Sequence, residues 1–142
     1  MMPSDYRVLP NFAWSIKNGT PLSIYGSGEQ TRTFCYVTDA MIGFIKVMVN
    51  EPIGDVYNVG NPKPEISINN LVRLLSDLSG KDFSLKHMPY PESYPADEPM
   101  RRCPDISKIA AKLGFVPKIS LSEGLSRFLT WAESEYANLS NS

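Results

Sequence analysis

Two arginine-bearing motifs stand out among the residues that could do chemistry, 30-QTR-32 and 100-MRRCPD-105. Arg32 lies in a short run that we expect to be extended, and Arg102 comes shortly before the start of a predicted helix. Either arginine could be a solvated charge or a member of a surface ion pair. A guanidinium can also bind a diphosphate through paired hydrogen bonds. The two motifs are therefore candidates for an anion site that receives cations from distant segments.

Other polar residues near these motifs leave several interpretations open. Tyr94, Asp97 and Glu98 precede the second motif and could hold its arginines in place or close over a ligand. Cys103 stands beside an arginine, which can lower a thiol pKa, but no histidine or carboxylate constellation accompanies it. His87 lies in a strand-like segment and is more typical of a structural histidine than of a catalyst.

The stretch 25-YGSGEQTR-32 imitates a phosphate-binding glycine loop. A dinucleotide fingerprint needs a third glycine and a helix N-terminus that receives the pyrophosphate. Here the third glycine is missing and the run TRTFCYV follows in place of a helix. We therefore predict an ordinary hairpin turn at 26–28. Any phosphate held in this region would be held by Arg32, with Gln30 in support.

Composition excludes several classes of function. Fourteen basic and fifteen acidic residues nearly balance, so neither nucleic acid nor an anionic membrane is expected as a partner. Two cysteines and one histidine are too few for a structural zinc site. No secretory signal or long apolar run is visible, so we expect a cytoplasmic protein with reduced thiols and no membrane span.

The elements that must position these motifs alternate between helices and strands. Apolar spacing and capping residues predict helices at 8–18, 40–50, 68–79, 106–113 and from 121 onward, with Asp39, Ser67, Asp105 and Ser120 as caps and Gly19, Gly80 and Gly114 as ends. Strands are expected at 20–26, 31–37, 55–60 and 82–88. The helix at 40–50 carries one apolar stripe, and the proline-rich run 89–104 should be a loop. We expect one domain over 1–138 and a polar tail over 139–142.

Three stretches together resemble a known family: 25-YGSGEQTRTFCYVTDAMIGFIKVM-48, 57-YNVGNP-62 and 101-RRCPDISKIAAKLGFVPKISLSEGL-125. They are similar to the C-terminal part of extended short-chain dehydrogenases/reductases, in particular UDP-glucuronate decarboxylases and their nucleotide-sugar epimerase and dTDP-glucose 4,6-dehydratase relatives. The resemblance runs from about residue 5 to residue 132. It implies an α/β fold, namely the small substrate-binding domain of a Rossmann-type NAD-dependent epimerase/dehydratase.

The resemblance also implies roles for individual residues. The arginine of the QTR motif clamps the diphosphate in such enzymes, and the arginine of R-x-P-D reaches the substrate with an electrostatic or acid role. The residue before the first helix lies near both cofactor and sugar, and that helix helps to line the nucleotide pocket. Carried onto this sequence, the implied substrate-binding residues are Arg7, Tyr25, Gln30, Arg32, Tyr94 and Arg102.

The departures from the family are as informative as the matches. The sequence contains neither a glycine-rich NAD fingerprint nor a Tyr-x-x-x-Lys pair. We therefore expect a C-terminal fragment that lacks the dinucleotide-binding half, binds a UDP-sugar, binds no NAD by itself and is inactive alone. Its partner would be the missing half, or a second copy bound through the exposed face. A fragment of another epimerase or dehydratase and a non-enzymatic interaction subunit remain the alternatives.

Overall fold

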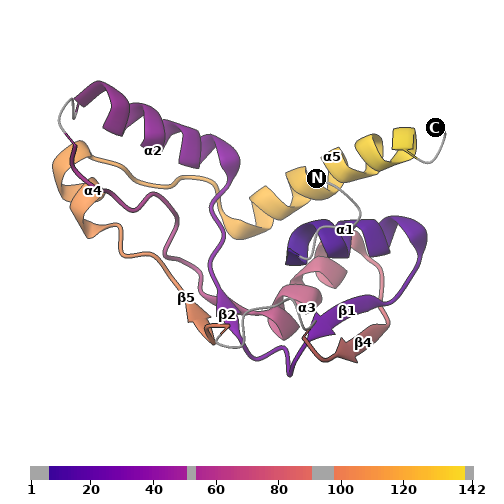
Figure 1. Cartoon of the computed structure of the whole chain (residues 1–142). Helices are drawn as coiled ribbons and strands as arrows, with labels where there is room; N and C mark the ends of the chain where they lie inside the picture. The colour runs from indigo at the N-terminus through magenta and orange to yellow at the C-terminus, as the bar shows by residue number, and fades with distance from the viewer. Residues whose placement is uncertain (1–6, 51–53, 91–97, 140–142) are drawn as a thin grey trace.

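The structure is a computed structural model that describes residues 7–50, 54–90 and 98–139. Its elements form two lobes (Figure 1). We call α1, α3, α5 and the β1–β4 pair the body, and we call α2, α4 and the chain segments that run beside them the arm. The elements in chain order are α1 (Val8–Asn18), β1 (Leu22–Tyr25), β2 (Thr31–Arg32), α2 (Val37–Asn50), β3 (Ile66–Ser67), α3 (Ile68–Ser79), β4 (Leu85–Met88), β5 (Arg101–Arg102), α4 (Ser107–Leu113) and α5 (Leu121–Leu139).

The core of the body forms where three amphipathic helices cover the first strand. Helix α3 illustrates the logic, because its apolar residues recur at helical spacing and turn to one side. Ser67 caps its start by accepting a hydrogen bond from the Asn70 backbone N–H at 3.2 Å, and Gly80 ends it with a φ of 65°. These predicted boundaries are confirmed. The buried core residues of the body are Phe12, Leu22, Ile24, Ile68, Leu71, Val72, Leu75, Leu121 and Leu125.

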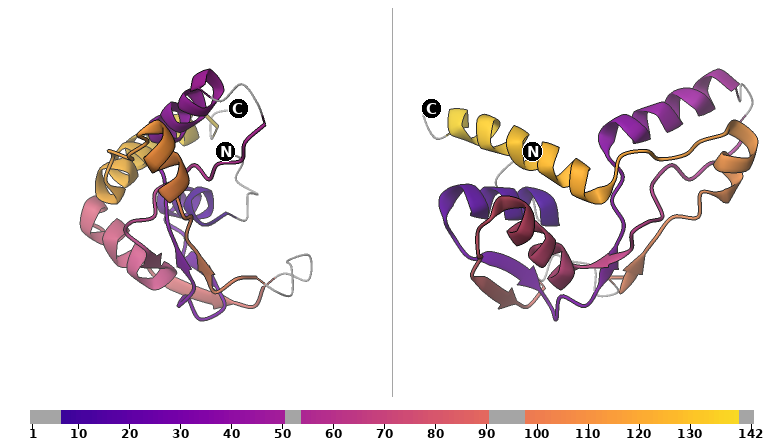
Figure 2. Two further views of the ribbon diagram at one scale, coloured as in Figure 1. Left: turned by 90° about the vertical axis from the view of Figure 1, so that its left-hand side faces the viewer. Right: turned by 180° about the vertical axis from the view of Figure 1, so that it is seen from behind.

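Two small sheets join segments that are distant in sequence. Strand β1 pairs with β4 in parallel, and β2 lies between an antiparallel β3 and a parallel β5. Gly26 and Gly28 do turn the chain, with φ angles of 68° and 77°. The predicted hairpin is nevertheless wrong, because β1 and β2 belong to different sheets. The turn instead carries the chain from the body to the junction between the lobes (Figure 2).

The start of α2 differs from its prediction. Only Thr31–Arg32 of the expected strand 31–37 pairs as a strand, and the helix already begins at Val37. Asp39 is therefore not the residue that caps it. The buried Asp39 carboxylate accepts the backbone N–H groups of Lys118 and Ile119 at 2.9 and 2.8 Å. A carboxylate in the first turn of α2 thus fixes the segment that leads into α5.

Residues 55–60 form no strand, contrary to prediction, and no described strand lies beside them. They run extended along the arm, where Val59 and Phe115 contact the α2 backbone so closely that a Cβ at Gly43 would lie 2.5 Å from Val59. The arm therefore packs through its inner side. Its outer side is apolar and exposed at Val37, Met41, Ile42, Phe44, Ile45, Met48, Val49 and Val56. No helix among the described residues is long and apolar enough to span a membrane.

Candidate functional site

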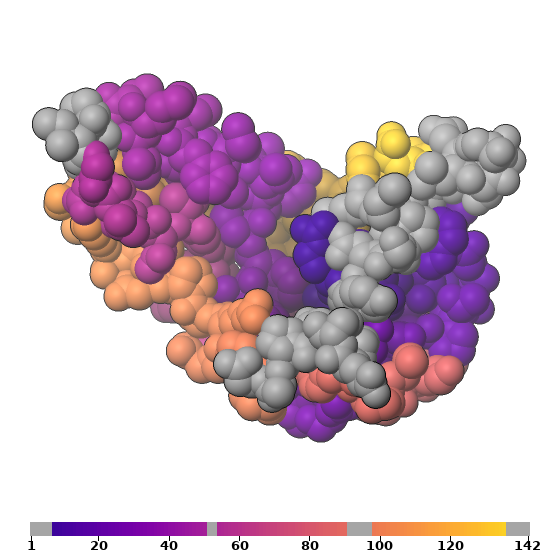
Figure 3. Space-filling model, in the orientation of Figure 1, coloured from indigo at the N-terminus to yellow at the C-terminus, as the bar shows by residue number. Residues whose placement is uncertain are grey.

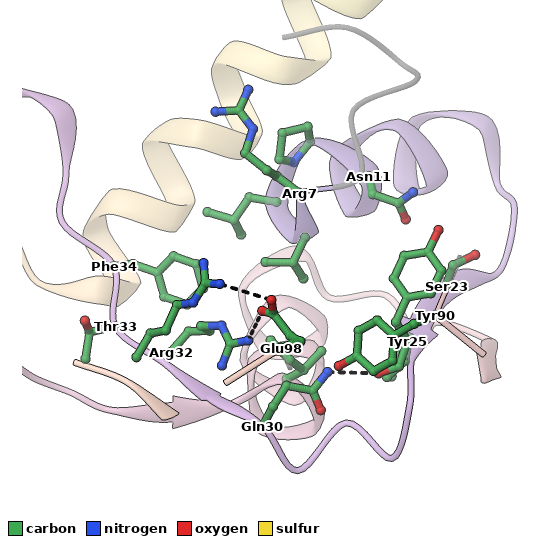
Figure 4. A pocket seen from close by; sticks show the side chains of 16 residues that line it. Arg7, Asn11, Ser23, Tyr25, Gln30, Arg32, Thr33, Phe34, Tyr90 and Glu98 are labelled. Carbon is green, nitrogen blue, oxygen red and sulfur yellow. Dashed lines mark hydrogen bonds and ion pairs between the residues drawn. The ribbon is translucent and has the colours of Figure 1, made fainter. Parts of the chain in front are cut away.

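A cavity of about 360 Å³ opens where the N-terminus of α1 meets the ends of β1, β2 and β5 (Figure 4). Segments that are distant in the sequence build it, because the parallel pairing of β2 with β5 brings residue 102 beside residue 32. Its polar lining is Arg7, Asn11, Ser23, Tyr25, Gln30, Arg32, Thr33, Tyr90, Glu98 and Arg102. Its apolar lining is Val8, Leu9, Pro10, Ile24, Phe34 and Ile68.

Three guanidiniums and one carboxylate set the charge of this cavity. Glu98 bridges two of the arginines, with Oε1 2.5 Å from Arg32 Nη2 and Oε2 3.0 Å from Arg102 Nη2. Arg32 also donates to the carbonyl of Thr31 at 2.7 Å. Arg7 contributes a third guanidinium to the lining. Guanidiniums gathered around one cavity favour an anion as its ligand.

Two stacked tyrosines form the opposite wall. The rings of Tyr25 and Tyr90 have centroids 5.9 Å apart and planes inclined by 23°. A side chain at position 26 would meet the Tyr90 ring at 3.1 Å, so Gly26 permits this approach. Buried Gln30 donates from Nε2 to the carbonyl of Tyr25 at 2.9 Å, which fixes the strand end that carries the ring. Such aromatic faces suit the stacking of a planar base.

Helix α1 contributes its first turn to the cavity. Arg7 occupies the N-cap position and is exposed, and Asn11 lies one turn further on. The Oδ1 atom of Asn11 is buried and finds no hydrogen-bond partner among the described residues. A buried acceptor without a partner is costly. A hydrogen-bond donor on a bound molecule, or water, would satisfy it.

The cavity brings together five of the six residues that the family resemblance implied: Arg7, Tyr25, Gln30, Arg32 and Arg102. The sixth, Tyr94, lies outside the described residues. Sequence reasoning missed Tyr90 and Ser23 as lining residues. Tyr90 could have been found from its place two residues beyond the end of a predicted strand, because strand ends often carry site residues.

Neighbouring groups behave as structural residues. His87 is exposed on β4, with Nδ1 3.0 Å from the carbonyl oxygen of Gly26. Burial, and secondly the charge of Asp39, raise the pKa of the Cys35 thiol, which disfavours a reactive thiolate. Cys35 lines a second cavity of about 440 Å³ whose walls are mostly apolar and which lies between α5 and the start of α2. Within the described part of the chain, no cluster of metal-ligating side chains occurs.

Comparison with known proteins gives consistent matches. Residues 1–60 match the NAD dependent epimerase/dehydratase family. The chain is 37% identical over 141 residues to UDP-glucuronic acid decarboxylase 1 of Xenopus tropicalis, which covers 99% of this chain and 32% of that protein. It is 38% identical over 121 residues to UDP-glucuronic acid decarboxylase 6 of Arabidopsis thaliana, covering 85% of this chain and 34% of that one.

Solved structures give the same result. The UDP-glucuronic acid 4-epimerase of Bacillus cereus, solved in complex with UDP-glucuronic acid and NAD, superposes with a TM-score of 0.84 at 30% identity, covering 96% of this chain and 42% of the epimerase. The dTDP-glucose 4,6-dehydratase DesIV of Streptomyces venezuelae has a TM-score of 0.84 at 25% identity, with 96% and 41% covered. The chain spans about a third of the length of the curated decarboxylases that it matches.

Proposed function

From the premise that this chain is homologous to part of the NAD-dependent epimerases and dehydratases, we propose that it is the nucleotide-sugar-binding part of an enzyme of the UDP-glucuronic acid decarboxylase type. The observation that carries the proposal is the convergence of three guanidiniums, those of Arg7, Arg32 and Arg102, on one cavity. A nucleoside diphosphate sugar carries one negative charge on each of its two phosphates, and guanidiniums bind phosphate oxygens through paired hydrogen bonds. The proposal rests on this match of chemistry.

The rest of the cavity fits the same ligand. The stacked pair Tyr25 and Tyr90 offers an aromatic face at the end opposite the arginines (Figure 4). A base stacked on these rings and a diphosphate at Arg32 and Arg102 would leave Arg7 and Thr33, which line the same cavity, available to the sugar. Arg102, exposed and at the cavity edge, would then act on the sugar carboxylate electrostatically. Its role in this proposal is to orient the substrate, which is how binding energy serves a chemical step elsewhere.

The hydride chemistry of such an enzyme is supplied by NAD, and the residues present do not form a site for it. The Gly26–Gly28 turn continues into strand β2, whereas a pyrophosphate site needs a helix N-terminus after the turn. The sequence also lacks the Tyr-x-x-x-Lys pair. We therefore propose that this chain alone binds no NAD and catalyses no turnover. No reaction step is assigned to the residues of this chain beyond substrate binding and orientation.

The exposed apolar side of the arm is consistent with a binding surface for a partner. The exposed face of α2 presents Phe44 and Met48 at 55% and 73% exposure, and the helix itself borders the hollow between the two lobes (Figure 3). The superposed relatives carry more than half of their length beyond the part that this chain matches. We propose that a dinucleotide-binding half of that kind covers this face. Self-association through the same face is the alternative, and it would suit a non-enzymatic interaction subunit.

Binding measurements on the 142-residue chain test the function. Calorimetry with UDP, UDP-glucuronic acid and UDP-xylose should show binding, and Arg102→Ala should weaken it by about tenfold or more, the effect of a lost charged hydrogen bond. Arg101→Ala is the matched control, because Arg101 pairs with Glu65 and is not part of the cavity lining. Absence of binding to all three ligands contradicts the proposal. Binding of dTDP-glucose in preference to UDP-sugars would favour the dehydratase alternative.

A second experiment tests the partner. Phe44→Glu should leave the fold unchanged, because the side chain is exposed, and should abolish association with a dinucleotide-binding half supplied as a separate polypeptide. Decarboxylation of UDP-glucuronic acid by the mixture, and its loss with Phe44→Glu, would support the proposal. A dimer of the chain alone that Phe44→Glu dissociates would instead favour the interaction subunit.

A further inference from the structure

We propose that Glu98 is the positioning residue of this site: it holds Arg32 and Arg102 in the arrangement that receives a diphosphate. The inference rests on the function proposed above and adds to it a residue that contacts the two arginines and is not required to contact the ligand. The Glu98 carboxylate reaches both guanidiniums, and Asp97 lies outside the described residues.

The need for such a residue follows from strand register. Arg32 on β2 pairs directly with Arg102 on the parallel strand β5. Two like charges at paired positions repel each other, and they destabilise the pairing of the strands that carry them. The pairing of β2 with β5 involves only two residues of each strand. A compensating charge is therefore required at this point if both guanidiniums are to face the cavity.

Glu98 meets that requirement with both of its oxygens. Oε1 accepts a hydrogen bond from Arg32 at 2.5 Å, and Oε2 accepts one from Arg102 at 3.0 Å. One carboxylate therefore lies between the two guanidiniums and holds them apart. Its side chain is only 11% exposed and that of Arg32 15%, whereas Arg102 is 58% exposed. The ion pair between Glu98 and Arg32 is therefore largely buried, whereas Arg102 is accessible to solvent. A guanidinium has five donors, so such a bridge leaves donors for a ligand.

A second glutamate on the same pair of strands provides an internal comparison. One position along, Thr31 pairs with Arg101, and Glu65 accepts from both, at 2.5 Å from Thr31 Oγ1 and 3.0 Å from Arg101 Nε. Neighbouring strand residues face opposite sides, and neither Glu65 nor Arg101 is part of the cavity lining. The two carboxylates thus support the same short strand pair, and one of them also organises the cavity.

If Glu98 positions the arginines, its replacement should change the affinity for UDP in the direction opposite to that expected from charge alone. Replacing Glu98 by glutamine removes a negative charge from a site that binds an anion, which by itself would raise affinity for UDP. If Glu98 positions the arginines, the same change releases Arg102 from its paired orientation and lowers affinity. Preorganised donors bind more tightly because less ordering is left to be done on binding.

The test compares UDP with uridine on four forms of the 142-residue chain, by calorimetry at low and at moderate salt. The forms are wild type, Glu98→Gln, Glu98→Asp and the control Glu65→Gln. Glu98→Gln should weaken UDP binding about tenfold and leave uridine binding within about twofold, because uridine has no phosphates. Glu98→Asp, which keeps the charge on a shorter side chain, should restore part of the loss. Glu65→Gln should bind both ligands like wild type.

Each other result has a distinct meaning. Tighter UDP binding by Glu98→Gln shows that Glu98 competes with the phosphates and overturns the inference. Equal weakening of UDP and uridine binding, or equal effects of Glu98→Gln and Glu65→Gln, shows a general structural role and also overturns it. Failure of the wild-type chain to bind UDP contradicts the proposed function itself, and the inference falls with it.

Discussion

The apolar stripe of α3 is buried in the body, whereas the apolar stripe of α2 faces outward on the arm. Both helices carry apolar residues at helical spacing. Leu71 of α3 is 0% exposed, while Ile45 of α2, near the middle of its helix, is 47% exposed. The difference lies in what surrounds each helix. Residues of α1, β1 and α5 share the core of α3, whereas among the described residues α2 packs against α4 and the extended segments beside it.

This comparison separates two kinds of information in an amphipathic pattern. The apolar stripe indicates that one face of the helix is suited to burial. The exposed fraction of its side chains shows whether other residues of this chain bury that face. For α3 the cover is intramolecular. For α2 the described residues of this chain supply no such cover, and the inner contacts at Gly43, Val59 and Phe115 hold the opposite side of the helix. Substitutions in the two lobes can break or sharpen this contrast.

The largest effect should come from the body core. Leu71→Ala leaves a cavity among enclosed neighbours, and we expect it to lower the free energy of unfolding by about 2–5 kcal/mol. Met48→Ala, its control on the exposed face of α2, should change that free energy by at most about 0.5 kcal/mol. Urea denaturation of both variants measures the difference. Similar losses for the two would mean that the chain buries both faces in solution.

The next effect concerns the joint between arm and body. Asp39→Ala removes the acceptor of the Lys118 and Ile119 backbone N–H groups. A buried donor left without a partner costs about 1–3 kcal/mol. Because water can enter the joint and bind these donors, we expect the total loss in the free energy of unfolding to be about 1–3 kcal/mol for the two together. Thermal unfolding should show the loss. Asp105→Ala, which removes an exposed carboxylate that accepts from the Ser107 N–H, should cost less, and an equal or larger loss would contradict the role given to Asp39.

A smaller effect should come from the inner side of the arm. Gly43→Ala gains about 1 kcal/mol of helix propensity, but its Cβ would lie 2.5 Å from a methyl group of Val59 and 3.1 Å from the Phe115 ring. Because overpacking costs about 1–3 kcal/mol and Val59 is stiff at χ1, we expect a net loss of about 1 kcal/mol. Denaturant titration measures it. A stabilised Gly43→Ala variant would show that the arm packs more loosely than described.

The smallest effect should be a pH dependence at the surface of the arm. Hydrogen bonds from Lys108, and then from Lys112, lower the pKa of the Asp55 carboxyl below its ordinary value. Since the folded pKa is depressed, the stabilisation is present above the unfolded pKa of about 3.9 and is lost as pH falls through the folded value. The Tm difference between wild type and Asp55→Asn should therefore shrink below about pH 4. A difference that persists unchanged at low pH would exclude the ion pairs as its cause.

Sequence reasoning succeeded where local chemistry decides the structure. The caps of α3 and α5 and the glycine ends of α1, α3 and α4 depend on residues within a few positions, and they are confirmed. It failed where a distant partner decides. Residues 55–60 have strand-like composition but no partner strand among the described residues, and Asp39 has cap-like placement but bonds to residues almost eighty positions away.

The candidate site shows the same division. Motif resemblance pointed to Arg7, Arg32 and Arg102, because these arginines belong to short recognisable patterns. Tyr90 could not be assigned in this way, since its role depends on stacking against Tyr25 across the β1–β4 pair. The contact of Glu98 with Arg32 likewise depends on the pairing of β2 with the distant strand β5. Long-range pairing therefore supplied what local sequence did not.

The packing of α1 against α5 has a consequence for how the protein is made. These helices contact each other although about a hundred residues separate them, and β1 must wait for β4 to complete its pair. During synthesis α1 and β1 therefore leave the ribosome before α5 and β4, which cover Phe12, Leu22 and Ile24 in the fold. Non-local contacts of this kind fold slowly and leave apolar surface open to aggregation. Synthesis of this chain should accordingly depend on chaperones more than its modest size suggests.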